Sequence, residues 1–255
     1  MLHTFILFII IFCCAIFNNN QLPNIPVKGY KLTWYDEFNG KQLNLSKWNH
    51  RGLGKREDAY ITKKAVKLNG KGQLIIKAYA ENDSVFTGMI STENIFKTQY
   101  GYFECRVKFV QTVGTISAFW LQSPLINTPN GIPEHAGAEI DIFEYFPHAN
   151  KSSVAHTLHW GGYDASTHKV AGPVWGKLGQ PLEGFHTIGF EWTENSYTTF
   201  VDGVVTYAGS ENISKKPEFM VLSLGVNALS AGPLNIKSLP NKLIVDYVRV
   251  YKKIR

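Results

Sequence analysis

The chain has 255 residues, of which 44% are hydrophobic, 13% aromatic and 18% charged, and its 26 Lys and Arg against 20 Asp and Glu give a net charge of +6. The low charged fraction excludes a disordered protein, a coiled coil and a charged helical bundle. The length suits one large β-sandwich domain, and the modest positive charge fits either an ordinary soluble surface or an anionic partner.

The N-terminal segment is apolar and carries no charged side chain before Lys28. Its uncharged run at 5–17 is shorter than the roughly 20 residues of a membrane-spanning helix and is typical of a secretory signal. We therefore expect a signal peptide over residues 1–20, a secreted or periplasmic protein and no transmembrane segment. The alternative is an outer-membrane lipoprotein acylated on Cys13 or Cys14.

The rest of the chain predicts β-strands separated by turns. Runs rich in β-branched and aromatic residues predict strands at 73–78, 101–110, 139–146, 186–192, 196–201 and 243–251. In residues 102–109 polar and apolar side chains alternate, which predicts a strand with one face on the core and one exposed. No ten-residue amphipathic helix is evident, so we expect a single all-β domain over residues 28–255.

Three carboxylates stand in one otherwise apolar run, Glu139-Ile-Asp141-Ile-Phe-Glu144. Because side chains alternate along a strand, Glu139 and Asp141 share a face, whereas a regular strand would point Glu144 to the other face. One extra residue, a β-bulge around Ile142-Phe143, would return Glu144 to the face of the other two. The alternative is a solvated strand face with no chemical role, which the apolar neighbours disfavour.

A trio of this kind suits glycoside cleavage. A retaining mechanism needs two carboxyl groups about 5 to 5.5 Å apart, one as nucleophile and one as acid/base. A third carboxylate between them would raise the pKa of one group by charge repulsion, so that this group stays protonated near neutral pH.

Several segments in the expected order resemble glycoside hydrolase family 16. The trio resembles the family's bulged E-x-D-x-x-E signature, and the other matching segments are 34–38, 89–93, 101–106, 118–121, 186–192, 201–203 and 246–251. This resemblance covers roughly residues 30–252. It implies a jelly-roll β-sandwich (concanavalin A-like) of two antiparallel sheets with a substrate cleft on the concave face, and an endo-acting retaining glycosidase.

The resemblance also implies roles for single residues. Glu139 matches the nucleophile, Glu144 the acid/base and Asp141 the carboxylate that assists them. Trp120 matches an aromatic platform for a sugar ring, with core packing as the alternative. The further candidates for substrate binding, each with a structural role as the alternative, are His159, Trp160, Asn227, Arg51 and Glu57.

No metal or cofactor is required for this two-carboxylate reaction. The resemblance implies a structural Ca²⁺ on the convex side, with Asp246 as a ligand, although the sequence has no calcium-loop spacing of its own.

The substrate is less well marked than the reaction. On family frequency we expect a β-1,3- or mixed-linkage β-glucan. The alternative is a galactan of the agar, porphyran, carrageenan or keratan type, because departures from the laminarinase pattern weaken the glucan assignment. A basic cluster at Arg51, Lys55 and Arg56 is either a solvated loop or a site that pairs with sulfate or uronate.

Other classes of protein fit the sequence less well. A non-catalytic glucan-binding protein would not need all three carboxylates. A transglycosylase usually has the unbulged signature. A nucleic-acid binder would need basic and aromatic residues interleaved on one face, and no segment has that pattern. We expect a monomer whose partner is the polysaccharide.

Overall fold

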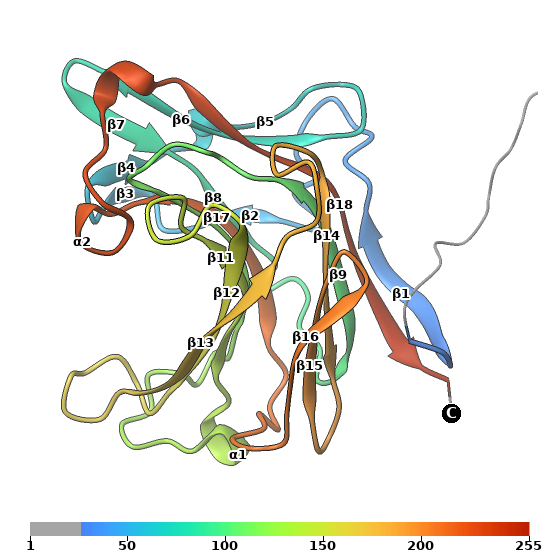
Figure 1. Ribbon diagram of the computed structural model, residues 1–255. Coiled ribbons are helices and arrows are strands. Elements are labelled where there is room, and N and C mark those ends of the chain that lie inside the picture. Colours follow the sequence, from blue (N-terminus) through green and yellow to red (C-terminus); the bar gives the residue numbers. More distant parts are fainter. Residues whose placement is uncertain (1–26, 255) are drawn as a thin grey trace, which may run out of the picture.

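The structure, a computed structural model, describes residues 27–254, so the predicted signal peptide and both N-terminal cysteines lie outside the described residues. Two β-sheets face one another in this part of the chain (Figure 1). Four short helices connect the strands: α1 (Pro133–Ala136), α2 (Ala228–Ala231) and the 3₁₀ helices η1 (Lys63–Ala65) and η2 (Ile236–Ser238). None of the helices in residues 27–254 is long and apolar enough to cross a membrane.

The larger sheet has 11 strands. They are β1 (Tyr30–Asp36), β3 (Gly54–Arg56), β4 (Ala59–Ile61), β5 (Val66–Leu68), β6 (Leu74–Glu81), β7 (Ser84–Thr87), β9 (Gly101–Lys108), β14 (His186–Trp192), β15 (Tyr197–Val201), β16 (Val204–Gly209) and β18 (Asn241–Lys253). Their order is β16-β15-β14-β9-β18-β6-β7-β4-β3, with β1 beside β18 and β5 beside β6.

The smaller sheet has seven strands in the order β13-β12-β11-β10-β17-β8-β2. They are β2 (Asn49–His50), β8 (Met89–Ser91), β10 (Thr115–Gln122), β11 (Glu139–Tyr145), β12 (Ser153–Trp160), β13 (Lys169–Lys177) and β17 (Phe219–Val226). The paired strands of both sheets are antiparallel, apart from β4 and β7, which pair in parallel. The predicted all-β sandwich and its six predicted strands are confirmed.

Strand alternation separates the core from the outer face of the smaller sheet. On β10, Phe119 and Leu121 are 0% exposed and belong to the main core, whereas Ala118 and Trp120 pack in a second cluster on the opposite face. The same alternation in β17 sends Leu222 into the core. The outer face of this sheet is therefore free to carry a site.

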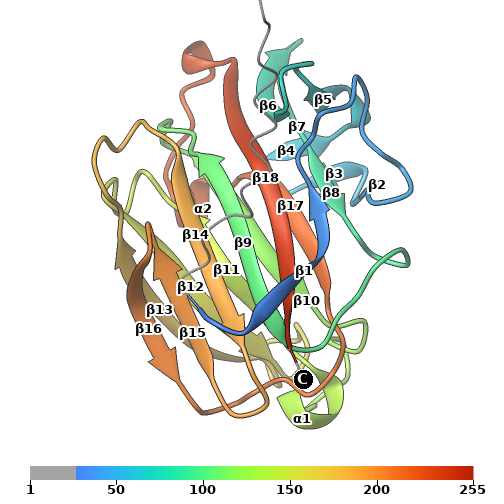
Figure 2. The same cartoon turned by 90° about the vertical axis from the view of Figure 1, so that its right-hand side faces the viewer.

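The prediction of an exposed polar face on β9 is wrong for the first half of the strand. Tyr102 and Glu104 are 1% and 4% exposed, because side chains of two other strands cover them: β1, which runs alongside β18 (Figure 2), covers Tyr102, and β18 itself covers Glu104. The ring of Tyr30 packs edge-on against Tyr102, with centroids 6.5 Å apart, and the hydroxyl of Tyr247 donates to Glu104 at 2.9 Å. Cover by a strand distant in sequence is not readable from local alternation.

Phe143, next to Glu144, packs in the core directly beneath the site, so its contribution to stability can be measured by substitution. Its side chain is 0% exposed and packs against Phe109 and Phe119, at centroid distances of 5.3 and 6.2 Å. Phe143→Ala should lower the free energy of unfolding by about 3–5 kcal/mol in denaturant titrations, because it leaves a cavity. Leu229→Ala, at a side chain 97% exposed, should change it by less than about 0.5 kcal/mol. Equal losses in the two variants would contradict this packing.

Candidate active site

A β-bulge in β11 brings the three predicted catalytic carboxylates to one face. The pairing of β11 with both β10 and β12 shifts register between Asp141 and Glu144. Ile142 and Phe143 both lie in the core, at 0% exposure, so two successive apolar residues are accommodated on the inner side. Glu144 thereby returns to the side of Glu139 and Asp141, and the predicted bulge is confirmed.

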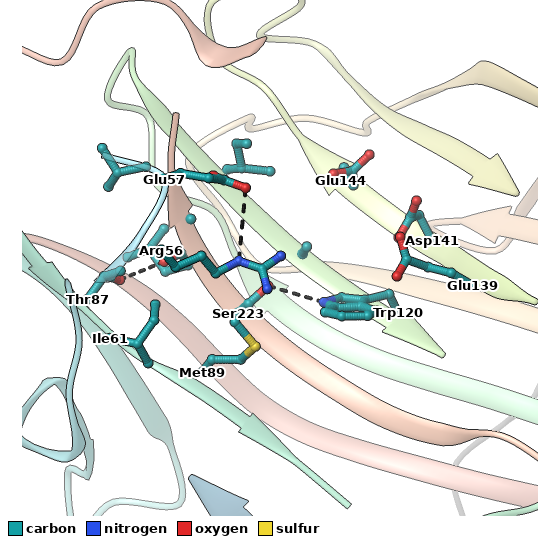
Figure 3. Close-up of a pocket in the computed structure, with 15 residues that line it drawn as sticks. Arg56, Glu57, Ile61, Thr87, Met89, Trp120, Glu139, Asp141, Glu144 and Ser223 are labelled. Carbon is teal, nitrogen blue, oxygen red and sulfur yellow. Dashed lines mark hydrogen bonds and ion pairs between the residues drawn. The ribbon is translucent and has the colours of Figure 1, made fainter. Parts of the chain in front are cut away.

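The three carboxylates line one cleft of about 600 Å³ on the outer face of the smaller sheet. Its floor comes from β8, β10, β11 and β17 of the smaller sheet, and its opposite wall includes β3 and β4. Arg56 and Glu57 lie across the cleft from the carboxylates (Figure 3). The structure therefore brings the predicted residues Trp120 and Glu57 together with the trio, beside Ile61, Met89 and Ser223.

Burial and mutual repulsion disfavour the charged forms of two carboxyl groups. Burial raises the pKa of the Asp141 carboxyl well above its usual range, and the charge of Glu139 raises it further. Burial also raises the pKa of Glu144, with the charge of Asp141 next in importance, while the imidazole of His159 acts in the opposite direction. Glu144 therefore keeps its proton at a pH where an exposed glutamate has lost it, as a general acid requires.

His159 contacts the central carboxylate. Its Nε2 lies 3.2 Å from Oδ2 of Asp141, and its Nδ1 lies 2.9 Å from Nε2 of His168. His159 faces Glu139 across the β11–β12 pair. The predicted cleft position of His159 thus places it against the trio, and His168 connects it to the loop before β13.

Two side chains that sequence analysis did not single out hold Glu139. Nε2 of Gln122 donates to Oε2 of Glu139 at 3.0 Å, and the hydroxyl of Tyr163 donates to the same oxygen. Gln122 follows Trp120 by two positions on β10, so strand periodicity could have placed it on the cleft face. Tyr163 lies in the loop between β12 and β13, where no spacing indicates its position.

Trp120 lies on the floor of the cleft. It is 6% exposed and packs in a cluster with Met89, Phe219 and other apolar side chains, while its indole N–H donates to Ser223 at 3.2 Å. Trp120 therefore both lines the cleft and packs in an apolar cluster. Its contact with a sugar ring stays a prediction.

Arg51 packs beside the rings of Trp120 and Phe219. Its guanidinium carbon is 6.0 Å from the Trp120 ring centroid. It forms an ion pair with Glu93 and donates to Oε1 of Gln122 at 2.5 Å. These contacts direct the guanidinium to protein groups, so its predicted role in binding substrate is not evident from its position.

Two other predicted binding residues do not line the carboxylate cleft. Trp160 follows His159 by one residue on β12, so alternation turns it to the opposite face, the side of Leu158, which packs on the core. Asn227 caps α2, and its side-chain oxygen accepts from the backbone N–H groups of Leu229 and Ser230 at 2.9 and 3.1 Å. Helix capping accounts for Asn227.

The surroundings of Asp246 do not fit the calcium ion that the resemblance implies. Its Oδ2 accepts from the guanidinium of Arg106 at 2.6 Å, and this positive charge already neutralises the carboxylate. Among residues 27–254, the one group of three acidic, His or Cys side chains close enough to share a cation is Glu139, Asp141 and His159, with ligand atoms within 4.8 Å of one another. That group belongs to the cleft.

The raised pKa of Glu144 has a consequence for stability. Between the ordinary carboxyl range, about pH 4, and the raised pKa, native Glu144 holds a proton that the unfolded chain has released, so stability falls as pH rises. Glu144→Gln cannot ionise. It should therefore unfold at a higher temperature than the wild type at pH 7 to 8, with the difference shrinking toward pH 4.

Thermal melts across this pH range measure the effect. The matched control is Glu134→Gln, because a hydrogen bond and ion pair with Lys215 lower the pKa of the exposed Glu134, so its loss should give no gain near neutral pH. Parallel pH–stability curves for Glu144→Gln and the wild type would contradict the raised pKa.

Comparison with known proteins bears on this site. "Glucan endo-1,3-beta-glucosidase A1" of Niallia circulans is 26% identical over 91% of this chain and 39% of its own length. "Beta-glucanase" of Rhodothermus marinus is 26% identical over 99% of this chain and 95% of its own. "Keratan-sulfate endo-1,4-beta-galactosidase" of Sphingobacterium multivorum is 26% identical over 89% and 56%. The chain thus spans well under two thirds of two of these three relatives.

A solved structure and a family model agree with these similarities. The crystal structure of laminarinase from Flavobacterium sp. UMI-01 superposes with a TM-score of 0.73, at 26% identity, over 87% of this chain and 100% of that one. The model of glycosyl hydrolases family 16 matches residues 54–246, which include the bulged β11 and the whole carboxylate trio. The chain belongs to glycosyl hydrolases family 16.

Proposed function

We propose that the protein is an endo-acting glycosidase that hydrolyses internal β-linkages of a polysaccharide with retention of anomeric configuration. The observation that carries the proposal is the placement of Glu139, Asp141 and Glu144 on one strand face in a cleft, in unequal environments. Glu139 accepts hydrogen bonds from two donors, whereas burial and charge repulsion raise the pKa of the other two. Environments that separate the protonation of neighbouring carboxyl groups assign acid and nucleophile.

The reaction follows in two displacements. Glu139 attacks the anomeric carbon while Glu144 gives its proton to the leaving glycosidic oxygen, which leaves a covalent glycosyl–enzyme and an ionised Glu144. Glu144 then takes a proton from water, and the oxygen of this water attacks the anomeric carbon and releases Glu139. Two inversions at the same carbon restore the starting configuration.

Asp141 assists by limiting the charge in the cleft. Burial and the neighbouring Glu139 raise the pKa of this carboxyl, which disfavours a further negative charge in the cleft, and Nε2 of His159 lies 3.2 Å from its Oδ2. Glu144 becomes ionised after the first displacement. A protonated Asp141 then does not repel this new negative charge, which stabilises the intermediate.

The first candidate substrate is a β-1,3- or mixed-linkage β-glucan. The similar proteins from N. circulans and R. marinus are named as a glucan endo-1,3-beta-glucosidase and a beta-glucanase, and the solved structure reported above is a laminarinase. Trp120 on the cleft floor supplies an aromatic surface on which a pyranose can pack.

The second candidate is a galactan with anionic groups. Arg56 favours it, because its guanidinium lines the cleft and its ion pair with Glu57 is long, at 3.9 Å, with the Arg56 side chain 48% exposed. A guanidinium so loosely held can pair with a sulfate or uronate group. The S. multivorum relative is named for keratan sulfate.

Export, a monomeric state and the rejection of a non-catalytic role also belong to this proposal. The apolar run at 5–17, which is typical of a secretory signal, supports export. A glucan-binding protein without activity would not need two carboxyl groups with raised pKa values beside a third, since removing these groups from water lowers stability.

A polysaccharide panel tests the reaction and ranks the substrates. Laminarin, lichenan, agarose, porphyran, carrageenan and keratan sulfate are incubated with the protein, and new reducing ends are counted. We expect cleavage of laminarin or lichenan, reduced about 10²- to 10⁴-fold in Glu144→Ala and at least as far in Glu139→Ala. The exposed-site variant Glu134→Ala serves as control. Undiminished cleavage by either cleft variant would contradict the assignment, and cleavage of sulfated chains alone would reverse the order of substrates.

The stereochemistry of the product tests the two-step mechanism. Proton NMR of the first minutes of hydrolysis should show the β-anomer of the new reducing end before mutarotation, because each displacement inverts the anomeric carbon once. Initial formation of the α-anomer would contradict a nucleophilic role for Glu139.

A further inference from the structure

The side chains around Glu139 form a chain of hydrogen bonds with a defined direction. Arg51 donates to Oε1 of Gln122 at 2.5 Å, Nε2 of Gln122 donates to Oε2 of Glu139 at 3.0 Å, and the other N–H of that amide is directed at the hydroxyl of Tyr163. The hydroxyl in turn donates to Oε2 of Glu139. Each link uses a donor against an acceptor, so the four groups are mutually satisfied.

Arg51 fixes which way the amide of Gln122 points. A guanidinium has donors and no acceptor, so the oxygen of the Gln122 amide must face it and the NH₂ group must face Glu139. Arg51 is itself held from two sides: it pairs with Glu93, and its guanidinium carbon lies 4.9 Å from the ring centroid of Phe219. A reversed amide would bring its oxygen against the carboxylate.

Tyr163 reaches Glu139 because of the two glycines before it. Gly161 and Gly162 adopt φ angles of +81° and +88°, and a Cβ on Gly161 would collide with the carbonyl oxygen of Thr167. These conformations favour glycine and bend the loop back toward β11. Although 47% of Tyr163 is exposed, its hydroxyl end lies against the carboxylate, and this burial together with the charge of Glu139 raises the pKa of the hydroxyl.

Both donors go to one oxygen of Glu139. Among the described residues no hydrogen bond reaches Oε1, so that oxygen is left for the anomeric carbon. Gln122 also stands directly opposite Glu139 in the β10–β11 register, and it is 6% exposed. Gln122 is therefore a buried cross-strand partner whose amide orientation is fixed by Arg51, and it restricts the rotation of the Glu139 carboxylate.

We propose that Gln122 and Tyr163 are positioning residues for the nucleophile Glu139, with Arg51 acting on it through Gln122. The pair stabilises the ionised carboxylate and presents one oxygen to the sugar. This inference rests on the proposed function for its catalytic meaning, but the effect on the carboxylate itself does not require turnover to be measured.

Carboxyl ¹³C NMR of the full chain labelled on glutamate provides that measurement. The Glu139 resonance is identified by its loss in Glu139→Gln. In Tyr163→Phe and in Gln122→Met its titration midpoint should move to higher pH by about one unit, because a hydrogen bond to a charged group is lost. Arg51→Met should move it in the same direction by less. Tyr35→Phe is the matched control, since Tyr35 is 48% exposed and lies on β1, away from the cleft.

Kinetics on a polysaccharide that the wild type cleaves give the second measurement. Tyr163→Phe and Gln122→Met should lower kcat about 10- to 100-fold with KM within about twofold, because they act on Glu139 and not on the bound chain. A raised KM with unchanged kcat would instead make Tyr163 a substrate contact and overturn the proposal.

The two measurements separate the two proposals. An unmoved midpoint in both variants overturns the positioning role even where the wild type is active. A moved midpoint in a protein that cleaves no polysaccharide leaves the positioning role standing and refutes the proposed function.

Discussion

The active site depends on a conflict between strand periodicity and the need for three carboxylates on one face. Alternation alone would bury Glu144 in the sandwich or expose a core residue. The register shift between Asp141 and Glu144 resolves this by placing Ile142 and Phe143 in succession on the inner side, where both are fully buried. The same residues that fill the core therefore set the position of the acid, so that packing and chemistry are fixed by one irregularity.

The electrostatics of the site follow from this placement. Three carboxyl groups that share one cleft repel one another when charged, so some of them stay protonated. The three groups differ in their burial and in their hydrogen-bond donors. Gln122 and Tyr163 supply donors to Glu139, whereas Asp141 is buried and Glu144 half-buried, and within residues 27–254 neither of these two carboxyl groups forms an ion pair with Lys or Arg. The arrangement lowers stability at neutral pH, as is common where a group is held in the protonation state that its chemistry requires.

The sequence was most informative where local rules apply. Strand runs, the absence of long helices, the bulge and the trio all follow from alternation, spacing and turn chemistry over a few residues. What sequence reasoning missed depends on contacts between distant segments: the cover of Tyr102 by β1 and of Glu104 by β18, the return of Tyr163 through Gly161 and Gly162, and the link from Arg51 to Gln122. Trp160 illustrates a different limit, because proximity to His159 in sequence implied a shared cleft, whereas alternation places the two on opposite faces.

The two sides of the cleft differ in how well they should tolerate substitutions, because the wall that includes β4 joins the larger sheet only at its edge, through the parallel pairing with β7. The floor on β10, β11 and β17 is continuous with the main core, so a substitution there disturbs the whole sandwich. The opposite wall includes the β3–β4 hairpin, whose β3 residues are exposed and which joins the larger sheet at its edge through β7. Substitutions at wall residues such as Arg56 should therefore lower the stability of the fold only slightly. Carbohydrate preference can change in this way while the catalytic strand β11 stays the same.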